Sequence, residues 1–438
     1  MKKIIYFAIS CCLCIESAMA QNDTLFLSLE ECRNRALATN ENIRKSDNLV
    51  KQSELDKKIA FSSYLPTVDG SATAIYTKDL DLSGTKLLMH GMWMAGFSLQ
   101  QVLYAGGRVK NGNDLAEIGL DISQQQQRKS RQEVLLEADQ TYWGYVAVLQ
   151  KIKMLESYVE YIDGVDKSVA NSVEAELATK ADQLRVNAKL SEIKYNLQKA
   201  KNGAELCRLM LCNVIGEDFE TQVLPADTEI NIESPGSLDD NVNDCPEVQL
   251  MQMGIKAREK QVKLAKGELL PTLALVGGWD YMGNLKMEGV TEYQGMMIPY
   301  TQSFDQSFWY GALSLSVPIW NWGKSCNSVK KAKLDVENAE LDLQRNTRLL
   351  TIQARQAVQN VMSGYSLIET AQLGYEQATE NLRIMREKYD GNYCTLTDLL
   401  DAQSQWQQAE CNLIEAKTQY KISESEYLKA IGKLGEKK

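Results

Sequence analysis

Hydrophobic positions along the chain change their spacing, from three and four residues to two and back again. Over 108–174 and over 324–390, apolar residues recur at helical spacing and no proline interrupts the pattern. The three-four spacing is that of a coiled-coil seam. Each range therefore predicts one helix of about 67 residues, roughly 100 Å long at 1.5 Å per residue. Helices of this length are much longer than the diameter of a small globular domain.

Both rods are followed by a signal for a new helix. Thr179 has Asp182 three residues later, and Thr395 has Asp398 at the same distance. This spacing is an acidic variant of the capping box that begins helices. The sequence therefore predicts that each rod turns back near its threonine.

The returning helices are shorter than the rods. They are predicted over 179–215 and 395–432, about 37 residues each. Helices of about 23 residues are predicted before two prolines, over 43–65 and 248–270. Two short helices stacked end to end would then match one rod.

Alternating positions predict strands between the helical segments. From 309 to 319 the odd positions are apolar and several even ones are small or polar, and 273–281, 68–76 and 93–99 continue the pattern. Five of the seven tryptophans lie in or beside these strands. One hairpin alone could be an ordinary half-buried sheet, but aromatic-ended alternating strands are typical of outer-membrane proteins. We expect Leu313, Leu315 and Val317 to face lipid.

The chain contains one unit twice. Leu65-Pro66-Thr67 recurs as Leu270-Pro271-Thr272, a shift of 205 residues, whereas Gly107 matches Gly323 and Thr179 matches Thr395 at a shift of 216. The shift changes by eleven residues between the prolines and the glycines. A longer loop is therefore expected there in the second copy.

The patterns predict a definite division of the chain. It comprises a signal peptide over 1–20, a first repeat over 21–216, an acidic linker or equatorial segment over 217–246, and a second repeat over 247–438. The first repeat is expected to hold helices over 28–65, strands over 66–104 and helices over 108–215. The second is expected to hold a helix over 247–270, strands over 271–320 and helices over 324–432.

The first twenty residues predict export. Two lysines precede the apolar run from Ile4 to Ile15, and Ala18-Met19-Ala20 gives a small-x-small cleavage site before Gln21. Lipidation at Cys11 is the alternative. No later run of about eighteen apolar residues follows, so a membrane would have to be entered by strands.

Composition argues against several function classes. The net charge of −10 makes a nucleic-acid partner unfavourable. His90 is the single histidine, and the seven cysteines after the signal include no CxxC pair. We therefore expect neither an enzyme nor a cofactor nor a metal site.

Four strands cannot close a sheet, and open edges in lipid leave backbone groups without partners. Two copies would give eight strands with a filled interior, whereas three give twelve strands and room for a pore. The predicted fold class is an α+β membrane protein. Its duplicated unit of long coiled-coil helices and two β-hairpins forms a trimeric 12-stranded β-barrel continued by a periplasmic α-helical barrel.

The chain resembles the TolC family of trimeric outer-membrane efflux proteins. The resemblance rests on Leu65-Pro66 and Leu270-Pro271, on the strand-to-helix crossings at 102–108 and 317–324, and on the run from Tyr389 through Asp398-Leu399-Leu400-Asp401-Ala402-Gln403. The crossings contain Gly107 and Gly323. Three features differ from the family pattern: Val102 stands where proline is frequent, the first tip has no glycine, and Gly391 lies one place early.

This resemblance implies the exit duct of a tripartite efflux pump or of a type I secretion system, in the outer membrane of a Gram-negative bacterium. The implied partners are two further copies of the chain, outer-membrane lipid, a periplasmic adaptor and an inner-membrane transporter. Asp398 and Asp401 match the family's gate acids, and Tyr389 and Arg383 lie close enough in sequence to supply bonds that hold the gate closed. Six carboxylates around one mouth would favour cations.

Simpler interpretations stay open at this point. Asp398 could be a helix cap alone and Asp401 a solvated acid, and the nine acids of 216–246 fit a solvated connector better than an adaptor-binding patch. A periplasmic coiled-coil scaffold or adaptor is the alternative function. Such adaptors need one helical hairpin, however, and this chain predicts two. No substrate is inferred, because a wide conduit need not recognise its cargo.

Overall fold

The computed structural model describes residues 24–78, 80–82, 85–88 and 91–436. The predicted signal peptide, Cys11 and His90 lie outside the described residues. The chain forms two compact units, which we call the helical unit (Met1–Asn48, Gln125–Gln249 and Gln344–Lys438) and the strand unit (Leu49–Gln124 and Leu250–Leu343). Each unit takes segments from both predicted repeats.

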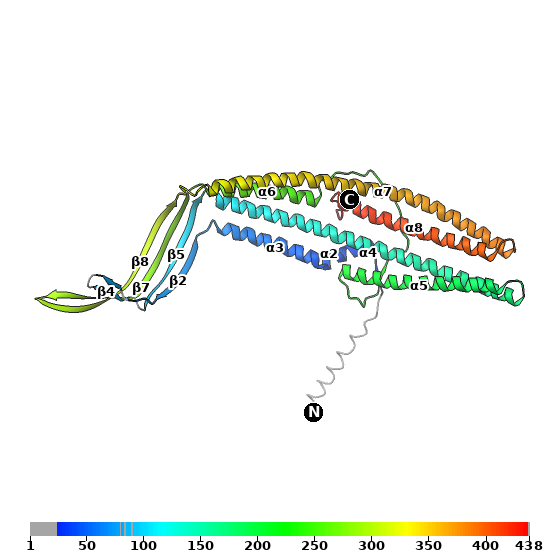
Figure 1. Cartoon of the computed structure of the whole chain (residues 1–438), viewed down its shortest axis with the longest axis horizontal. Coiled ribbons are helices and arrows are strands. Elements are labelled where there is room, and N and C mark those ends of the chain that lie inside the picture. The colour runs from blue at the N-terminus through cyan, green and yellow to red at the C-terminus, as the bar shows by residue number, and fades with distance from the viewer. Residues whose placement is uncertain (1–23, 79, 83–84, 89–90, 437–438) are drawn as a thin grey trace, which may run out of the picture. The chain divides into compact units, whose positions relative to one another are not determined.

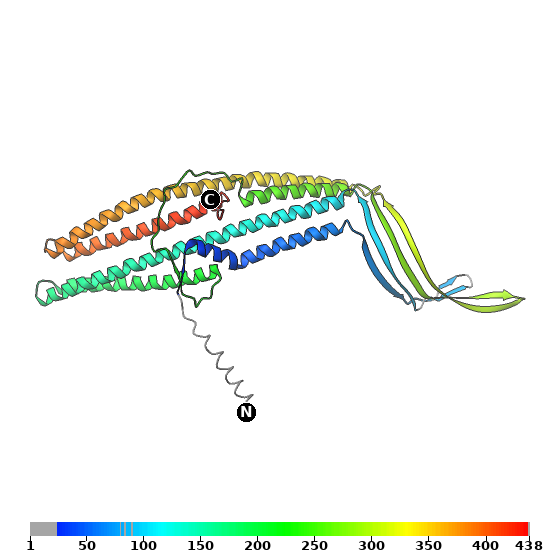
Figure 2. The same cartoon turned by 180° about the vertical axis from the view of Figure 1, so that it is seen from behind.

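The helices follow the predicted ranges closely. They are α2 (Leu29–Thr39), α3 (Glu41–Ser62), α4 (Arg108–Glu174), α5 (Lys180–Ile215), α6 (Pro246–Gly267), α7 (Lys324–Asp390) and α8 (Leu396–Ala430). The rods α4 and α7 have 67 residues each. Figure 1 shows that α5 returns along α4 and that α8 returns along α7, and Figure 2 shows the same two hairpins from behind. None of the helices in the described part of the chain combines the length and apolar character needed to cross a membrane.

Two helices end earlier than predicted, at Ser62 and Gly267 rather than at the residue before each proline. The last residues before Pro66 and Pro271 form tight turns with bonds such as Leu65 N to Ser62 O and Leu270 N to Gly267 O. A residue before proline is disfavoured in the helical region, which explains the early ends. Both prolines join a helix to a strand, as predicted.

Hydrophobic clusters form the core of the helical unit, and three of them contain a fully buried tyrosine. One joins α2, α4 and α5 around the buried Tyr142, the second joins α4, α5 and the start of α8 around Tyr158, and the third joins α7 and α8 around Tyr420. The buried Asp139 of α4 accepts two 2.6 Å bonds from Arg33 of α2 and one from Ser425 of α8. The ion pair joins two helices of the first repeat, and the Ser425 hydrogen bond connects them to α8 of the second repeat.

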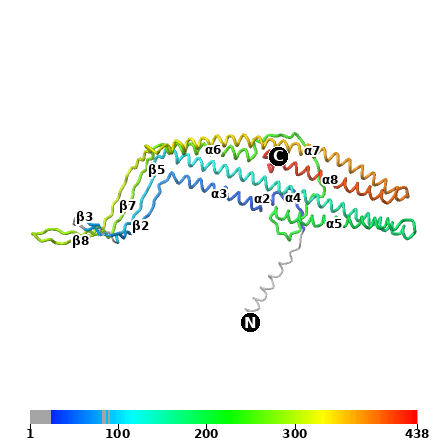
Figure 3. The backbone as a smooth tube through the Cα atoms, in the orientation of Figure 1, coloured from blue at the N-terminus to red at the C-terminus, as the bar shows by residue number. Residues whose placement is uncertain are grey.

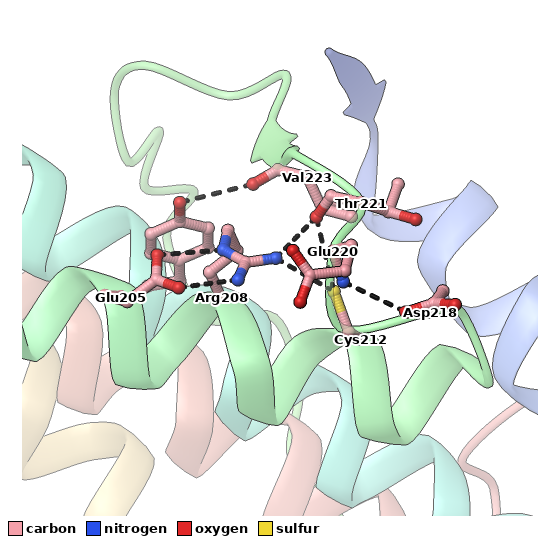
Figure 4. A network of polar contacts seen from close by, with 8 residues as sticks. Glu205, Arg208, Cys212, Asp218, Glu220, Thr221 and Val223 are labelled. Atoms are coloured by element: carbon pink, nitrogen blue, oxygen red, sulfur yellow. Dashed lines mark hydrogen bonds and ion pairs between the residues drawn. The ribbon is translucent and has the colours of Figure 1, made fainter. Parts of the chain in front are cut away.

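The acidic segment is mostly irregular, as its three prolines predict. Only β6 (Val223–Pro225) forms a strand, which pairs in parallel with β1 (Leu25–Leu27). Figure 4 shows how its first turn is held: Arg208 of α5 binds Glu205 through two bonds and donates to Thr221 O at 2.5 Å. The buried guanidinium thus fixes the chain at the point where it leaves the first repeat.

One antiparallel sheet dominates the strand unit. Its strands are β2 (Thr67–Ile75), β3 (Leu80–Leu82), β4 (Thr85–Leu88), β5 (Met92–Ala105), β7 (Thr272–Tyr293) and β8 (Met296–Ser316). The long strands lie in the order β2, β5, β7, β8. Register places Phe97 opposite Trp279 and Trp279 opposite Trp309, so aromatic and aliphatic side chains share one face. Asp69 and Asp280 have the opposite parity, on the more polar face.

The longer connection in the second repeat is strand and not loop, which corrects the prediction. β7 and β8 continue past β2 and β5 (Figure 3) to a two-residue turn at Gln294 and Gly295, whose φ angles are 53° and 77°. Two positive φ angles are the mark of a type I′ turn, which matches the twist of a hairpin. The short β3–β4 hairpin, which the sequence patterns did not predict, pairs with the extension of β7.

The predicted strand over 309–319 ends early, at Ser316, so the prediction that Val317 lies within a strand is wrong. Pro318, two residues after the end of the strand, has no N–H to donate. In the first repeat Val102 takes the place of this proline, and β5 continues through a bulge to Ala105.

Candidate functional site

The two helical turns at the ends of the hairpins share one backbone conformation. Glu176 and Asn392, which are equivalent in the two repeats, have φ angles of 59° and 61°. Leu177 N bonds to Ser172 O at 2.8 Å, and Tyr393 N bonds to Lys388 O at 2.7 Å. This left-handed ending is the Schellman pattern. The first tip has no glycine and Gly391 lies one place early, but both turns still form because Glu176 and Asn392 adopt the left-handed conformation.

Both predicted capping boxes are formed. Thr179 Oγ1 and Thr395 Oγ1 each donate at 2.7 Å to the aspartate three residues later, and each accepts a 3.2 Å bond from that aspartate's backbone N–H. These hydrogen bonds hold the pKa of Asp182 and of Asp398 below the ordinary aspartate value. Both carboxylates therefore stay ionised at neutral pH.

The candidate gate acids lie on one side of the first turns of α8. Asp398 and Asp401 are exposed, while Leu399 and Ala402 are buried against α7. Residues three apart share a helix face, so both carboxylates point to solvent from the same face. Asp398 is at once a cap and an exposed charge.

Tyr389 and Arg383, which were predicted to supply bonds that hold the gate closed, make other contacts within the chain. Tyr389 is half-buried among the apolar residues of both hairpins, and this burial raises its pKa. Arg383 binds Glu380 and Glu387 on its own helix, with distances from 2.6 to 2.9 Å. Within one chain, Arg383 therefore engages acids of α7 and not Asp398.

Two polar contacts between the hairpins had no signal in the sequence. Arg185 of α5 donates to Thr397 Oγ1 of α8 at 2.9 Å. The guanidinium carbon of Arg386 on α7 lies 3.9 Å from the centroid of the Tyr161 ring on α4. Nη2 of Arg386 also donates to Oε1 of Gln403 on α8 at 3.3 Å. These contacts join the α4–α5 hairpin to the α7–α8 hairpin beside the candidate gate acids.

The strand unit carries the second set of predicted site residues. Leu313 and Leu315 are 63% and 64% exposed on β8, on the apolar face of the sheet. Val317 is exposed but follows the strand. Gly107 and Gly323 have φ angles of 79° and 78°, so both crossings use the left-handed region that favours glycine.

The described residues contain no group of three or more histidine, cysteine or acidic side chains that could hold a metal ion. The seven cysteines in the described part of the chain are all free thiols.

The sequence and the fold are both similar to those of known export proteins and outer-membrane channels. The chain is 20% identical to toxin and drug export protein A of Aggregatibacter actinomycetemcomitans over 409 residues, which covers 90% of this chain and 83% of that protein. The fold matches the CmeC outer-membrane channel of Campylobacter jejuni with a TM-score of 0.77 and 18% identity, over 94% of this chain and 87% of that one. It matches CusC with a TM-score of 0.77 and 13% identity, over 94% and 95% of the two chains.

The chain, with its two helical hairpins and its antiparallel sheet, thus shares its fold with solved outer-membrane channels. Residues 32–210 and 242–433 match the family described as outer membrane efflux protein. The chain belongs to this family. Membership confirms the predicted TolC-like fold, the outer-membrane location and the role in efflux, and the family is one of transport proteins.

Proposed function

We propose that the chain is the passive outer-membrane exit duct of a tripartite efflux pump or a type I secretion system, and that it works as a homotrimer. A periplasmic adaptor and an inner-membrane transporter would supply substrate and energy. The observation that carries this proposal is the sheet of the strand unit. It has one apolar face, and each of its outer long strands is paired on one side only among the described residues.

The physical reason for a trimer is closure. A sheet edge in hydrocarbon leaves N–H and C=O groups without partners at a cost of several kcal/mol each. The long strands of three copies would close one barrel of twelve strands with a lumen, whereas those of two copies would leave an interior filled by side chains. The trimer is therefore the smallest assembly that both closes the sheet and conducts.

Gating would take place at the tips of the helical hairpins. Asp398 and Asp401 present two exposed carboxylates per chain, so three copies would concentrate six charges around one mouth. Such a ring attracts cations and slows anions. In this proposal Arg185 and Arg386 hold the two hairpins of each chain together, so that a tip opens by moving as a unit.

Membrane fractionation followed by mass measurement of the detergent-solubilised protein tests this function. We expect the chain in the outer-membrane fraction and a mass of three chains after subtraction of bound detergent. A stable monomer, or recovery in the soluble periplasmic fraction, would instead support the scaffold or adaptor alternative.

Conductance gives a second, independent test. The purified assembly should form ion-conducting pores in planar bilayers without nucleotide or added cofactor. Protein that inserts as a trimer and does not conduct would contradict the duct while leaving the assembly intact.

A further inference from the structure

The alternation of apolar and polar residues changes sides along β8. From Trp309 to Leu315 its odd positions are apolar or glycine. Over 296–304, by contrast, the even positions are large and apolar except for Gln302, and the odd positions of 301–307 are threonine, serine or aspartate. Successive side chains of a strand point to opposite faces of the sheet, so the apolar face of this strand changes sides along its length.

β7 makes the same change through a bulge. Met282 pairs with Gln306 and Leu285 pairs with Phe304, so two residues of β7 stand opposite one residue of β8 between these pairs. The extra residue turns the later side chains of β7 to the other face, while the faces of β8 continue unchanged. The residues that share a face with Phe304, which we call the apolar extension face, are Leu285, Met287, Gly289, Thr291, Tyr293, Met296, Ile298, Tyr300 and Gln302.

The two faces of this hairpin extension differ in charge. Lys286, Glu288 and Glu292 all lie on the opposite face, and the described residues of the apolar extension face include no charged side chain. Tyr293 and Met296 on the apolar extension face are 64% and 65% exposed. Contiguous exposed apolar side chains of this kind mark a site of interaction.

The apolar extension face continues the lumen side of the sheet in the proposed duct. Trp309 and Leu315 have odd positions on β8 and face lipid in that proposal, so the even positions of the same strand face the lumen. Tyr300 and Phe304 have even positions, and no bulge of β8 separates them from the main sheet. The apolar extension face therefore lies along the path of molecules that leave the duct.

Hydrogen bonds hold the root of the extension in place. The backbone N–H of Asn284 donates to Asp305 Oδ1 at 2.8 Å, and Asn284 Nδ2 donates to Gly91 O at 2.9 Å. β4 also pairs with β7 over 286–288, directly beyond the bulge. The apolar extension face is therefore presented by paired strands at a fixed place, and not by a free loop.

A tyrosine ring lies across a glycine on this face. Tyr300 is the cross-strand partner of Gly289, and a Cβ added to Gly289 would lie 2.8 Å from Cε1 and Oη of Tyr300. The ring therefore rests on the bare backbone of Gly289. Aromatic rings stack on other flat apolar groups, and the flexible thioether of Met296 on the same face adapts to ligands of different shapes.

We propose that the apolar extension face binds molecules that carry a flat apolar group as they leave the duct. Tyr300 stacks on the flat group, and Met296 and Ile298 pack against its edges. Because this face has no charged side chain, it holds the apolar part of such a molecule and not a charged part. The inference rests on the proposed duct, and it adds the chemical class of a cargo and the place where that cargo is bound.

Dye binding by matched variants tests this site. The probe is anilinonaphthalene sulfonate, which binds exposed apolar surface, titrated into the full chain in phosphatidylglycerol nanodiscs, with empty nanodiscs as background. Tyr300→Ala should weaken dye binding about tenfold, which corresponds to about 1.4 kcal/mol. Gly289→Ala should also weaken it, because the new methyl group displaces the Tyr300 ring. Met296→Ala should weaken dye binding, whereas Met297→Ala, which removes a 74% exposed side chain from the opposite face, should not.

Conductance in planar bilayers separates this inference from the proposed duct. The dye should reduce the current through the wild type more than the current through Tyr300→Ala. A conducting wild type that binds no dye, that binds it as well as Tyr300→Ala does, or that is blocked to the same extent as Tyr300→Ala would overturn the inference and leave the duct in place. A protein that binds dye through Tyr300 and does not conduct would overturn the duct, and with it the assignment of bound molecules as cargo.

Discussion

The two strand-to-helix crossings have nearly the same backbone and opposite surroundings. Gly106 and Gly107 have φ angles of 62° and 79°, and Trp322 and Gly323 have 53° and 78°. The first crossing is packed against Gly267 of the other repeat, whereas the second exposes its tryptophans. Duplication thus gives the chain two equivalent surfaces, of which only the first is covered by the residues that the structure describes.

The two helix tips differ in chemistry rather than in packing. Both end in a left-handed residue and both begin the returning helix with a Thr–Asp cap. The second tip then carries Asp401 where the first carries Arg185, which binds Thr397 of the other hairpin. Both repeats therefore have the same backbone conformation at the tip, whereas the proposed gate charge is concentrated at the tip of the second repeat.

Charge on the apolar sheet face should give the largest effect and should act alike in both repeats. Leu315→Arg and the equivalent Leu99→Arg should each cost roughly 2–4 kcal/mol where the residue lies near the bilayer midplane. Ser314→Arg on the opposite face is the matched control and should cost less. The free energy of unfolding from lipid vesicles measures the difference. A Leu315→Arg protein as stable as the wild type would contradict the assigned face.

Substitution at the two crossings should separate folding of the chain from association of copies. Gly106→Ala should destabilise the chain by about 1–3 kcal/mol, because its Cβ would meet Gly267 O and Leu270 Cβ. Trp322→Ala should leave unfolding of the chain almost unchanged and promote dissociation of the proposed trimer in detergent.

Thermal unfolding and native mass, measured together, check this pair. Equal effects of Gly106→Ala and Trp322→Ala on both measurements would show that the two crossings are not used differently.

Loss of the caps should have an intermediate effect that is the same at both tips. Thr395→Ala and Thr179→Ala should each cost about 1 kcal/mol and speed amide hydrogen exchange in the first turn of α8 or α5. The pKa of Asp398 is lowered in the folded chain, so its contribution is complete above the ordinary value of 3.8 and is lost as the pH falls through the lower folded value.

The acid-induced loosening of that first turn should therefore appear only below pH 3.8 and should be absent in Thr395→Ala. Loosening that begins well above this pH, or that persists unchanged without the threonine, would exclude the cap as its cause.

The smallest effect should come from the charge difference between the tips. Asp401→Ala should weaken cation preference while leaving the proposed trimer intact, because three fewer charges would lower the cation concentration at its mouth. Arg185→Ala should shift selectivity in the opposite direction, and Glu337→Gln, an exposed acid in the strand unit, is the control.

Reversal potentials under a salt gradient in planar bilayers measure this change. The same potential in wild type and Asp401→Ala would remove Asp401 from the mouth.

Much of the site's framework followed from local sequence patterns. The two 67-residue rods, the capping boxes at Thr179 and Thr395, and the crossings at Gly107 and Gly323 were predicted, because each depends on residues within a few positions of one another. Repeat shifts of 205 and 216 residues extended these predictions from one half of the chain to the other.

Only the tertiary structure decided where strands end and which distant side chains meet. The extension of β7 and β8 replaced a predicted loop, and β8 ended before Val317, because strand length depends on the partner strand as much as on alternation. Nothing in the sequence distinguishes Arg386, which stacks on Tyr161, from Arg383, which pairs along its own helix. Both are polar positions on one rod, and their roles differ because only the packing of the two hairpins determines which of them reaches another helix.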